Sequence, residues 1–182
     1  MNAVILEHSN LTDTVTFTAE GLKEAVPGNS YVTPVIQEGE TLTMEQCLYA
    51  IMLVSGNEVS TQVAMQVGGS VEGFVEMMNE KAQEIGCKDT HFVNANGLHD
   101  ENHYTTAHDL AMIAQEAYKN EEFRKIVGSR YYTIPATNKT AEERVLANHH
   151  ALLGEGDWHY DGCLGGKTGY TDTALNKIGR AS

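Results

Sequence analysis

The spacing of apolar residues changes along the chain, and this change predicts where helices replace extended segments. Residues 11–42 are rich in Thr, Val and Gly, and residues 14–17 and 31–32 are typical of short strands or extended arms separated by turns. Thr43 with Gln46 three residues later is typical of a capping box, so we expect a helix to begin there. Apolar residues then recur at helical spacing and predict one apolar face: Met44, Cys47, Leu48, Ile51 and Met52.

Further helices are predicted by caps and by the apolar positions between them. We expect helices over residues 57–67, from Ser70 to Gly86, from Thr106 to about residue 117, and over residues 121–127. Strands are expected at residues 131–134 and around Lys167, whereas the Asn-rich residues 88–105 indicate irregular structure. This layout predicts a mainly helical lobe, residues 42–127, flanked by segments of a sheet.

Composition and charge argue against several classes of function. The chain has 182 residues, which suits a single domain with a buried core. Its 12 Lys and Arg stand against 25 Asp and Glu, a formal net charge of -13. We expect no nucleic-acid partner, because affinity for phosphate backbones comes largely from Lys and Arg. We also expect no membrane segment and no signal peptide, since no window approaches the roughly 20 apolar residues that span a bilayer.

The cysteines and histidines do not indicate a disulfide framework or a metal site. Cys47, Cys87 and Cys163 are odd in number and contain no Cys-x-x-Cys pair, so we interpret them as reduced structural thiols. His99 and His103 lie in an Asn/Asp-rich loop, and no His-Glu-x-x-His pattern or Cys pair accompanies the histidines. We interpret six of them as solvent-facing or hydrogen-bonding groups: His99, His103, His108, His149, His150 and His159. We therefore expect neither a metal nor an organic cofactor.

Two short motifs carry candidate chemistry. Residues 55–57 (Ser-Gly-Asn) follow the apolar helix, and residues 167–169 (Lys-Thr-Gly) lie in a Gly-rich run. The second motif is not a mononucleotide-binding loop, since the position that must be Gly is Asp161. Taken alone, Ser55 could end one helix and Asn57 could cap the next, as these residue types commonly do.

The order and separation of the motifs, with the sequence around them, resemble the serine D-alanyl-D-alanine carboxypeptidases, penicillin-binding enzymes of peptidoglycan maturation. The similarity is carried by residues 42–57, 73–97 and 162–172. It implies an α/β (α+β) fold of the β-lactamase/transpeptidase type, with a helical lobe packed on an antiparallel sheet. It also implies that a serine acyl-enzyme removes the terminal D-Ala of peptidoglycan stem peptides ending in D-Ala-D-Ala, outside the cytoplasmic membrane. β-Lactams are further ligands of the intact family.

The resemblance assigns catalytic roles to three residues. It implies that Ser55 lies beside the catalytic lysine and relays protons, and that the Asn57 amide orients the substrate's peptide group. Lys167 supplies positive charge to the site.

The resemblance also assigns substrate-binding roles. Thr168 receives the terminal carboxylate, and Gly169 permits close approach of the backbone. The backbone N–H of Tyr170 is one oxyanion donor. His149 lies near the position where many relatives have a carboxylate-binding arginine, and a histidine there carries full charge only below about pH 6.5.

The family's nucleophile lies in a Ser-x-x-Lys element upstream of Ser-Gly-Asn, and this sequence has no such element. No Ser, Thr or Cys is followed by a Lys three residues later. We interpret residues 1–182 as a single penicillin-binding domain that is incomplete at both ends. We therefore expect little or no hydrolysis by this polypeptide. In the family, two further strands and a long helix follow the Lys-Thr-Gly motif. Residues 175–182 are too few to supply them.

Two alternatives remain at this point. One is a non-catalytic module that binds peptidoglycan or a partner protein through the remaining groove. The other, which the sequence favours less, is a relative of the class A β-lactamases. Those enzymes normally have Ser-Asp-Asn where this chain has Gly56, and they have a deacylating Glu loop that we do not find.

Overall fold

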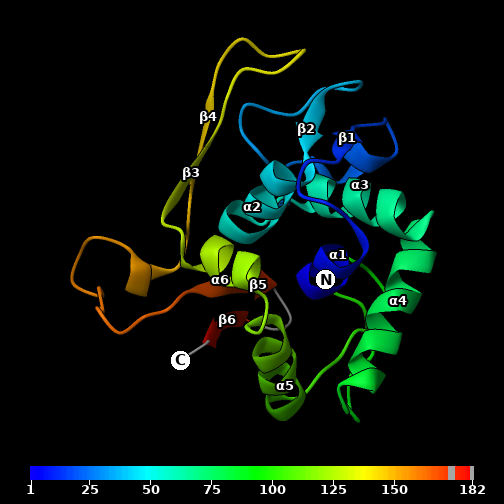
Figure 1. Cartoon of the computed structure of the whole chain (residues 1–182), viewed down its shortest axis with the longest axis vertical. Coiled ribbons are helices and arrows are strands. Elements are labelled where there is room, and N and C mark those ends of the chain that lie inside the picture. The colour runs from blue at the N-terminus through cyan, green and yellow to red at the C-terminus, as the bar shows by residue number, and fades with distance from the viewer. Residues whose placement is uncertain (172–174, 181–182) are drawn as a thin grey trace.

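The computed structural model describes residues 1–171 and the backbone of residues 175–180, which form helices and short strand pairs (Figure 1). The helices are α1 (Asn2–His8), α2 (Met44–Val54), α3 (Asn57–Gly68), α4 (Val71–Glu84), α5 (Ala107–Ala117) and α6 (Glu121–Gly128), with short 3-10 helices η1 (Gly21–Glu24) and η2 (Ala151–Leu153). The strands are β1 (Thr14–Thr16), β2 (Thr41–Thr43), β3 (Tyr131–Ile134), β4 (Arg144–Ala147), β5 (Gly166–Thr171) and β6 (Leu175–Arg180). None of the described helices has the length and apolar character needed to cross a membrane.

Helix α2 lies at the centre of the hydrophobic core. The predicted capping box is confirmed, since Thr43 Oγ1 accepts the Gln46 N–H at 3.2 Å and Gln46 Oε1 accepts the Thr43 N–H at 2.8 Å. Buried residues occupy all sides of the helix between Met44 and Leu53, so the single apolar face that we predicted is too narrow. The helix is covered by α3, α6 and the strands β1 to β4.

The other predicted helices are confirmed, and side-chain caps explain where two of them begin. Ser70 Oγ accepts the Gly73 N–H at 3.0 Å at the start of α4, and Thr106 Oγ1 accepts the Asp109 N–H at 3.1 Å at the start of α5. Helix α4 then buries one stripe of side chains: Phe74, Met78 and Ala82. Because that stripe faces inward, the opposite side of α4 is left to solvent.

The strands form three separate antiparallel pairs, β1 with β2, β3 with β4, and β5 with β6, rather than the single sheet that we predicted. Within the described residues no strand bonds to two others, so the pairs are not joined into one sheet. Strand β6 pairs with β5 from Gly166–Arg180 to Thr171–Leu175. The segment after residue 174 therefore gives the Lys167 strand a neighbour that our sequence interpretation did not provide.

A buried ion pair ties β4 to the loop that precedes β2. Arg144 is 1% exposed, and its two terminal nitrogens donate to Glu40 Oε1 and Oε2 at 2.8 and 3.2 Å, while its Nε donates to Pro34 O at 2.7 Å. Burial alone would raise the pKa of Glu40, but hydrogen bonds from Arg144, Thr137 and the Gln37 N–H outweigh it and lower that pKa. The β3–β4 ribbon is thus held against the segment of residues 34–40.

Candidate active site

Ser55 stands at a strained corner between α2 and α3. Its φ and ψ of 56° and 40° lie in the left-handed region, and it is the one non-glycine with positive φ among the described residues. That conformation costs an L-residue roughly 1–2 kcal/mol. The carbonyl of Ala50 accepts both the Ser55 and the Gly56 N–H, which holds the corner in place. Strained backbone of this kind clusters at functional sites.

The chain after Ser55 is fixed by a segment from an earlier part of the sequence. A Cβ added to Gly56 would lie 3.1 Å from a methyl carbon of Val59 and 3.3 Å from one of Val32, so a side chain here would have to displace these neighbours slightly. The Asn57 N–H donates to Ser30 O at 3.0 Å, and the Val32 N–H donates to Glu58 Oε1 at 2.8 Å. Residues 31–32, predicted as a short strand or an extended arm, thus form no strand, because the backbone of Val32 bonds to α3.

Strand β5 begins pressed against the end of α6. Gly165 has a φ of +143°, and a Cβ added there would lie 2.7 Å from Val127 O. A Cβ added to Gly128 would in turn lie 3.0 Å from Leu164 O. Only glycine permits this close approach without moving the backbone. Figure 1 shows α6 lying over β5, and this contact positions the strand that carries Lys167.

Lys167 and Ser55 meet although 112 residues separate them. Lys167 Nζ donates to Ser55 Oγ at 2.5 Å and also to the carbonyl oxygen of Thr168. Burial lowers the pKa of Lys167 to about 8. At neutral pH the ammonium group is therefore still mostly charged, yet it loses its proton far more readily than an exposed lysine. A serine hydroxyl in contact with such a lysine is suited to proton transfer.

The remaining predicted site residues differ in how deeply they are buried. Asn57 is buried at the first position of α3, and Thr168 is half-buried beside Lys167. Gly169 and Tyr170 are exposed farther along β5. His149 is exposed between β4 and η2.

Sequence reasoning missed Glu58, which lies directly after the Ser-Gly-Asn motif. Glu58 is 0% exposed, and its Oε2 has no hydrogen-bond partner among the described residues. Burial raises its pKa. An acidic residue in the first turn of a helix is usually solvated, so its type and position alone gave no signal of burial.

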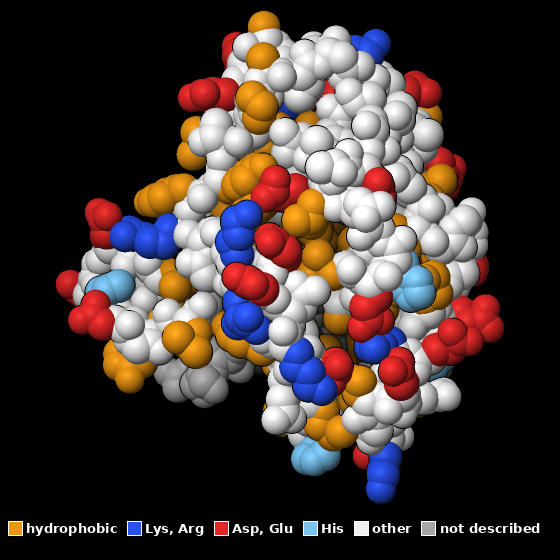
Figure 2. Space-filling model, in the orientation of Figure 1, with side chains coloured by type: hydrophobic (Ala, Val, Ile, Leu, Met, Phe, Trp, Pro, Cys, Tyr) orange, Lys and Arg blue, Asp and Glu red, His pale blue; other side chains and the backbone are white. Residues whose placement is uncertain are grey.

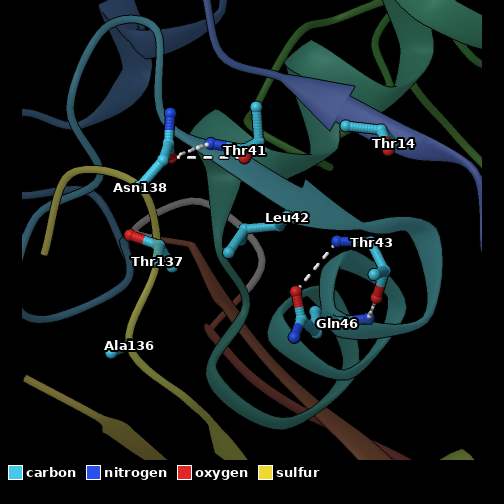
Figure 3. A pocket seen from close by; sticks show the side chains of 8 residues that line it. All are labelled: Thr14, Thr41, Leu42, Thr43, Gln46, Ala136, Thr137 and Asn138. Atoms are coloured by element: carbon cyan, nitrogen blue, oxygen red, sulfur yellow. Dashed lines mark hydrogen bonds between the residues drawn. The ribbon is translucent and has the colours of Figure 1, made fainter. Parts of the chain in front are cut away.

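The described residues hold no group of three or more His, Cys, Asp or Glu side chains placed to bind a metal ion. A pocket of about 280 Å³ lies at β2, but it is lined by neither Ser55 nor Lys167. Its polar groups bond to one another, as when Asn138 Oδ1 accepts the Thr41 N–H at 2.9 Å (Figure 3).

Comparison with solved structures defines the class of protein. The chain is similar to a Streptomyces DD-transpeptidase (TM-score 0.84, 29% identity), of which it covers 69% while 96% of this chain is matched. It is equally similar to a D-alanyl-D-alanine carboxypeptidase of Mycobacterium tuberculosis (TM-score 0.83, 29% identity), with 96% of this chain and 62% of that chain covered. The fold is thus that of the DD-peptidases, and the predicted fold class is confirmed.

Comparison of sequences then identifies the family. The family model for D-alanyl-D-alanine carboxypeptidase matches residues 2–181, and the chain belongs to this family. It is 38% identical over 139 residues to the carboxypeptidase DacF of Bacillus subtilis, covering 76% of this chain and 34% of DacF. A Streptomyces carboxypeptidase is 31% identical over 176 residues, covering 91% of this chain and 59% of the relative. The chain therefore spans between about a third and three fifths of these relatives.

Proposed function

We propose that residues 55–57 and 167–170 form the serine–lysine part of a site for peptidoglycan stem peptides ending in D-Ala-D-Ala, in the cell envelope. The observation that carries this proposal is the 2.5 Å hydrogen bond from Lys167 Nζ to Ser55 Oγ. It joins the two motifs on which the family resemblance rests. The membership of the chain in the carboxypeptidase family supports the substrate class.

In a complete site of this family Ser55 would relay protons beside the catalytic lysine, and Lys167 supplies positive charge. The Lys167 ammonium attracts the substrate's terminal carboxylate, which Thr168 binds through its hydroxyl. Exposed Gly169 leaves room for the peptide beside β5, and the Tyr170 N–H is one oxyanion donor. The Asn57 amide orients the substrate's peptide group.

His149 has a separate place in the proposal. It contributes to recognition of the substrate's terminal carboxylate. The charge that attracts this carboxylate comes chiefly from Lys167.

We further propose that the 182-residue polypeptide binds such peptides without hydrolysing them. Its sequence has no Ser-x-x-Lys element, so neither the nucleophile nor its activating lysine is available within it. Removing a covalent nucleophile leaves only the effects of binding and polarisation. In this form the chain acts as a non-catalytic peptidoglycan-binding module.

Two measurements test these proposals. Intact mass before and after exposure to a penicillin should be unchanged, whereas a gain of one drug mass would reveal a nucleophile in this chain. Isothermal titration with a D-Ala-D-Ala peptide should detect binding that Lys167→Ala weakens and that Lys88→Ala, at an exposed position, does not. Equal binding by the two variants would place the peptide elsewhere.

A further inference from the structure

A groove on the outer side of α4 lies apart from the Ser55–Lys167 pair. It is a shallow, open depression with a volume of about 420 Å³. Two kinds of side chain dominate its lining, three partly exposed apolar residues and three exposed glutamates: Val75, Phe92, Val93, Glu72, Glu76 and Glu80.

The two sides of the groove are fastened to each other. Asn79 Nδ2 donates to Phe92 O at 2.9 Å, and the Phe92 N–H donates to Asn79 Oδ1 at 2.8 Å. The Phe92 ring also meets the His103 ring edge-on, with centroids 5.5 Å apart. The groove is therefore preformed, and a ligand would not have to order it on binding.

The three glutamates form an uncompensated row of negative charge. They recur at every fourth residue, so they share one face of α4 and span about 12 Å. Within the described part of the chain none of them forms an ion pair. Lys81, the one basic residue of α4, pairs with Glu7 and Glu84 instead. Like charges four residues apart destabilise a helix. In Figure 2 acidic side chains gather on the right of the molecule, over α4.

We propose that this groove binds a basic, amphipathic helical segment of a partner protein. A helix with Lys or Arg at every fourth residue matches the spacing of the glutamates, and its apolar residues meet Val75, Phe92 and Val93. The lining contains no Lys or Arg that would repel such a segment. The net charge of -13 further favours a basic partner by steering its approach.

The test uses a fluorescein-labelled helical peptide with lysines at every fourth residue and leucines beside them. Its fluorescence anisotropy should rise on titration with the full chain, and added salt should weaken the binding. Exchanging Glu72, Glu76 and Glu80 together for Gln should weaken binding about tenfold, since each exposed ion pair contributes little.

A matched triple variant separates this groove from general charge attraction. Glu38, Glu142 and Glu143 are exposed elsewhere, and exchanging them for Gln changes the net charge by the same amount. This variant should bind the peptide less than about twofold more weakly than the unchanged chain. A peptide with Ser in place of Leu should lose affinity for the groove.

Three results would overturn the proposal. The first is the absence of any peptide binding, and the second is an equal loss in both triple variants. The third is a dimer of this chain, detected by sedimentation, that covers α4 and that the peptide does not dissociate. A second copy of the chain would then occupy the groove.

Discussion

Replacing Lys167 with Met removes a buried amine but keeps an unbranched side chain, and the effect should depend on pH. Burial lowers the pKa of Lys167 from 10.5 to about 8. Between these values the unfolded chain holds a proton that the folded chain has lost, so the unchanged protein gains stability as the pH rises. The full difference corresponds to about 3 kcal/mol, of which about 2 kcal/mol accumulates between pH 7 and pH 9.5.

Urea unfolding at several pH values measures this difference. The free energy of unfolding of the unchanged protein, minus that of Lys167→Met, should rise by about 2 kcal/mol between pH 7 and pH 9.5. Subtraction cancels the titration of every other group, and Lys88→Met controls for the loss of one positive charge at an exposed position. Parallel pH dependence of the unchanged protein and Lys167→Met would refute the desolvation of the Lys167 amine.

Three further substitutions test the supports of the site. Thr43→Ala removes the cap of α2 and should lower the thermal midpoint, with a loss of about 1 kcal/mol. Arg144→Met leaves Glu40 buried without its partner and should cost about 3–5 kcal/mol in urea unfolding. Gly165→Ala places a Cβ 2.7 Å from Val127 O and should speed hydrogen exchange in β5 while α2 stays protected.

Each of these substitutions has a matched control. Thr12→Ala changes an exposed threonine and should leave the midpoint in place; an equal fall would deny the cap any special role. Adding Glu40→Gln to Arg144→Met should restore part of the loss, and no recovery would contradict the charge argument. Gly28→Ala also places a side chain at a positive φ but with no atom within 4 Å, so an equal effect on β5 would exclude the steric explanation.

The helices could be predicted from the sequence because their signals are local. The cap at Thr43 and the caps at Ser70 and Thr106 lie within three residues of the groups they bond, and the apolar spacing repeats within each helix. At residues 31–32 the same local reasoning left a strand or an extended arm open, and the Val32 N–H bonds to a carboxylate 26 positions away. A segment's own composition does not reveal such a distant partner.

The candidate site could be predicted only in part, for the same reason. Apolar spacing placed Ser55 at the end of a helix, but nothing in that pattern joins it to Lys167, which is 112 residues away. The family resemblance placed both residues in one site. It did not indicate the buried Glu58, nor the pairing of Arg144 with Glu40 over 104 residues.

Contacts between residues far apart in the sequence fix the backbone on both sides of the candidate site. Ser55 occupies a backbone conformation that helix propensity disfavours, so its neighbours must impose it. They do so from both sides, because Ala50 O accepts two successive N–H groups and Ser30 O accepts the N–H of Asn57. The other half of the site depends on Gly165, whose φ of +143° brings β5 against α6. The orientation of the serine toward the lysine is thus built into the backbone before any substrate binds.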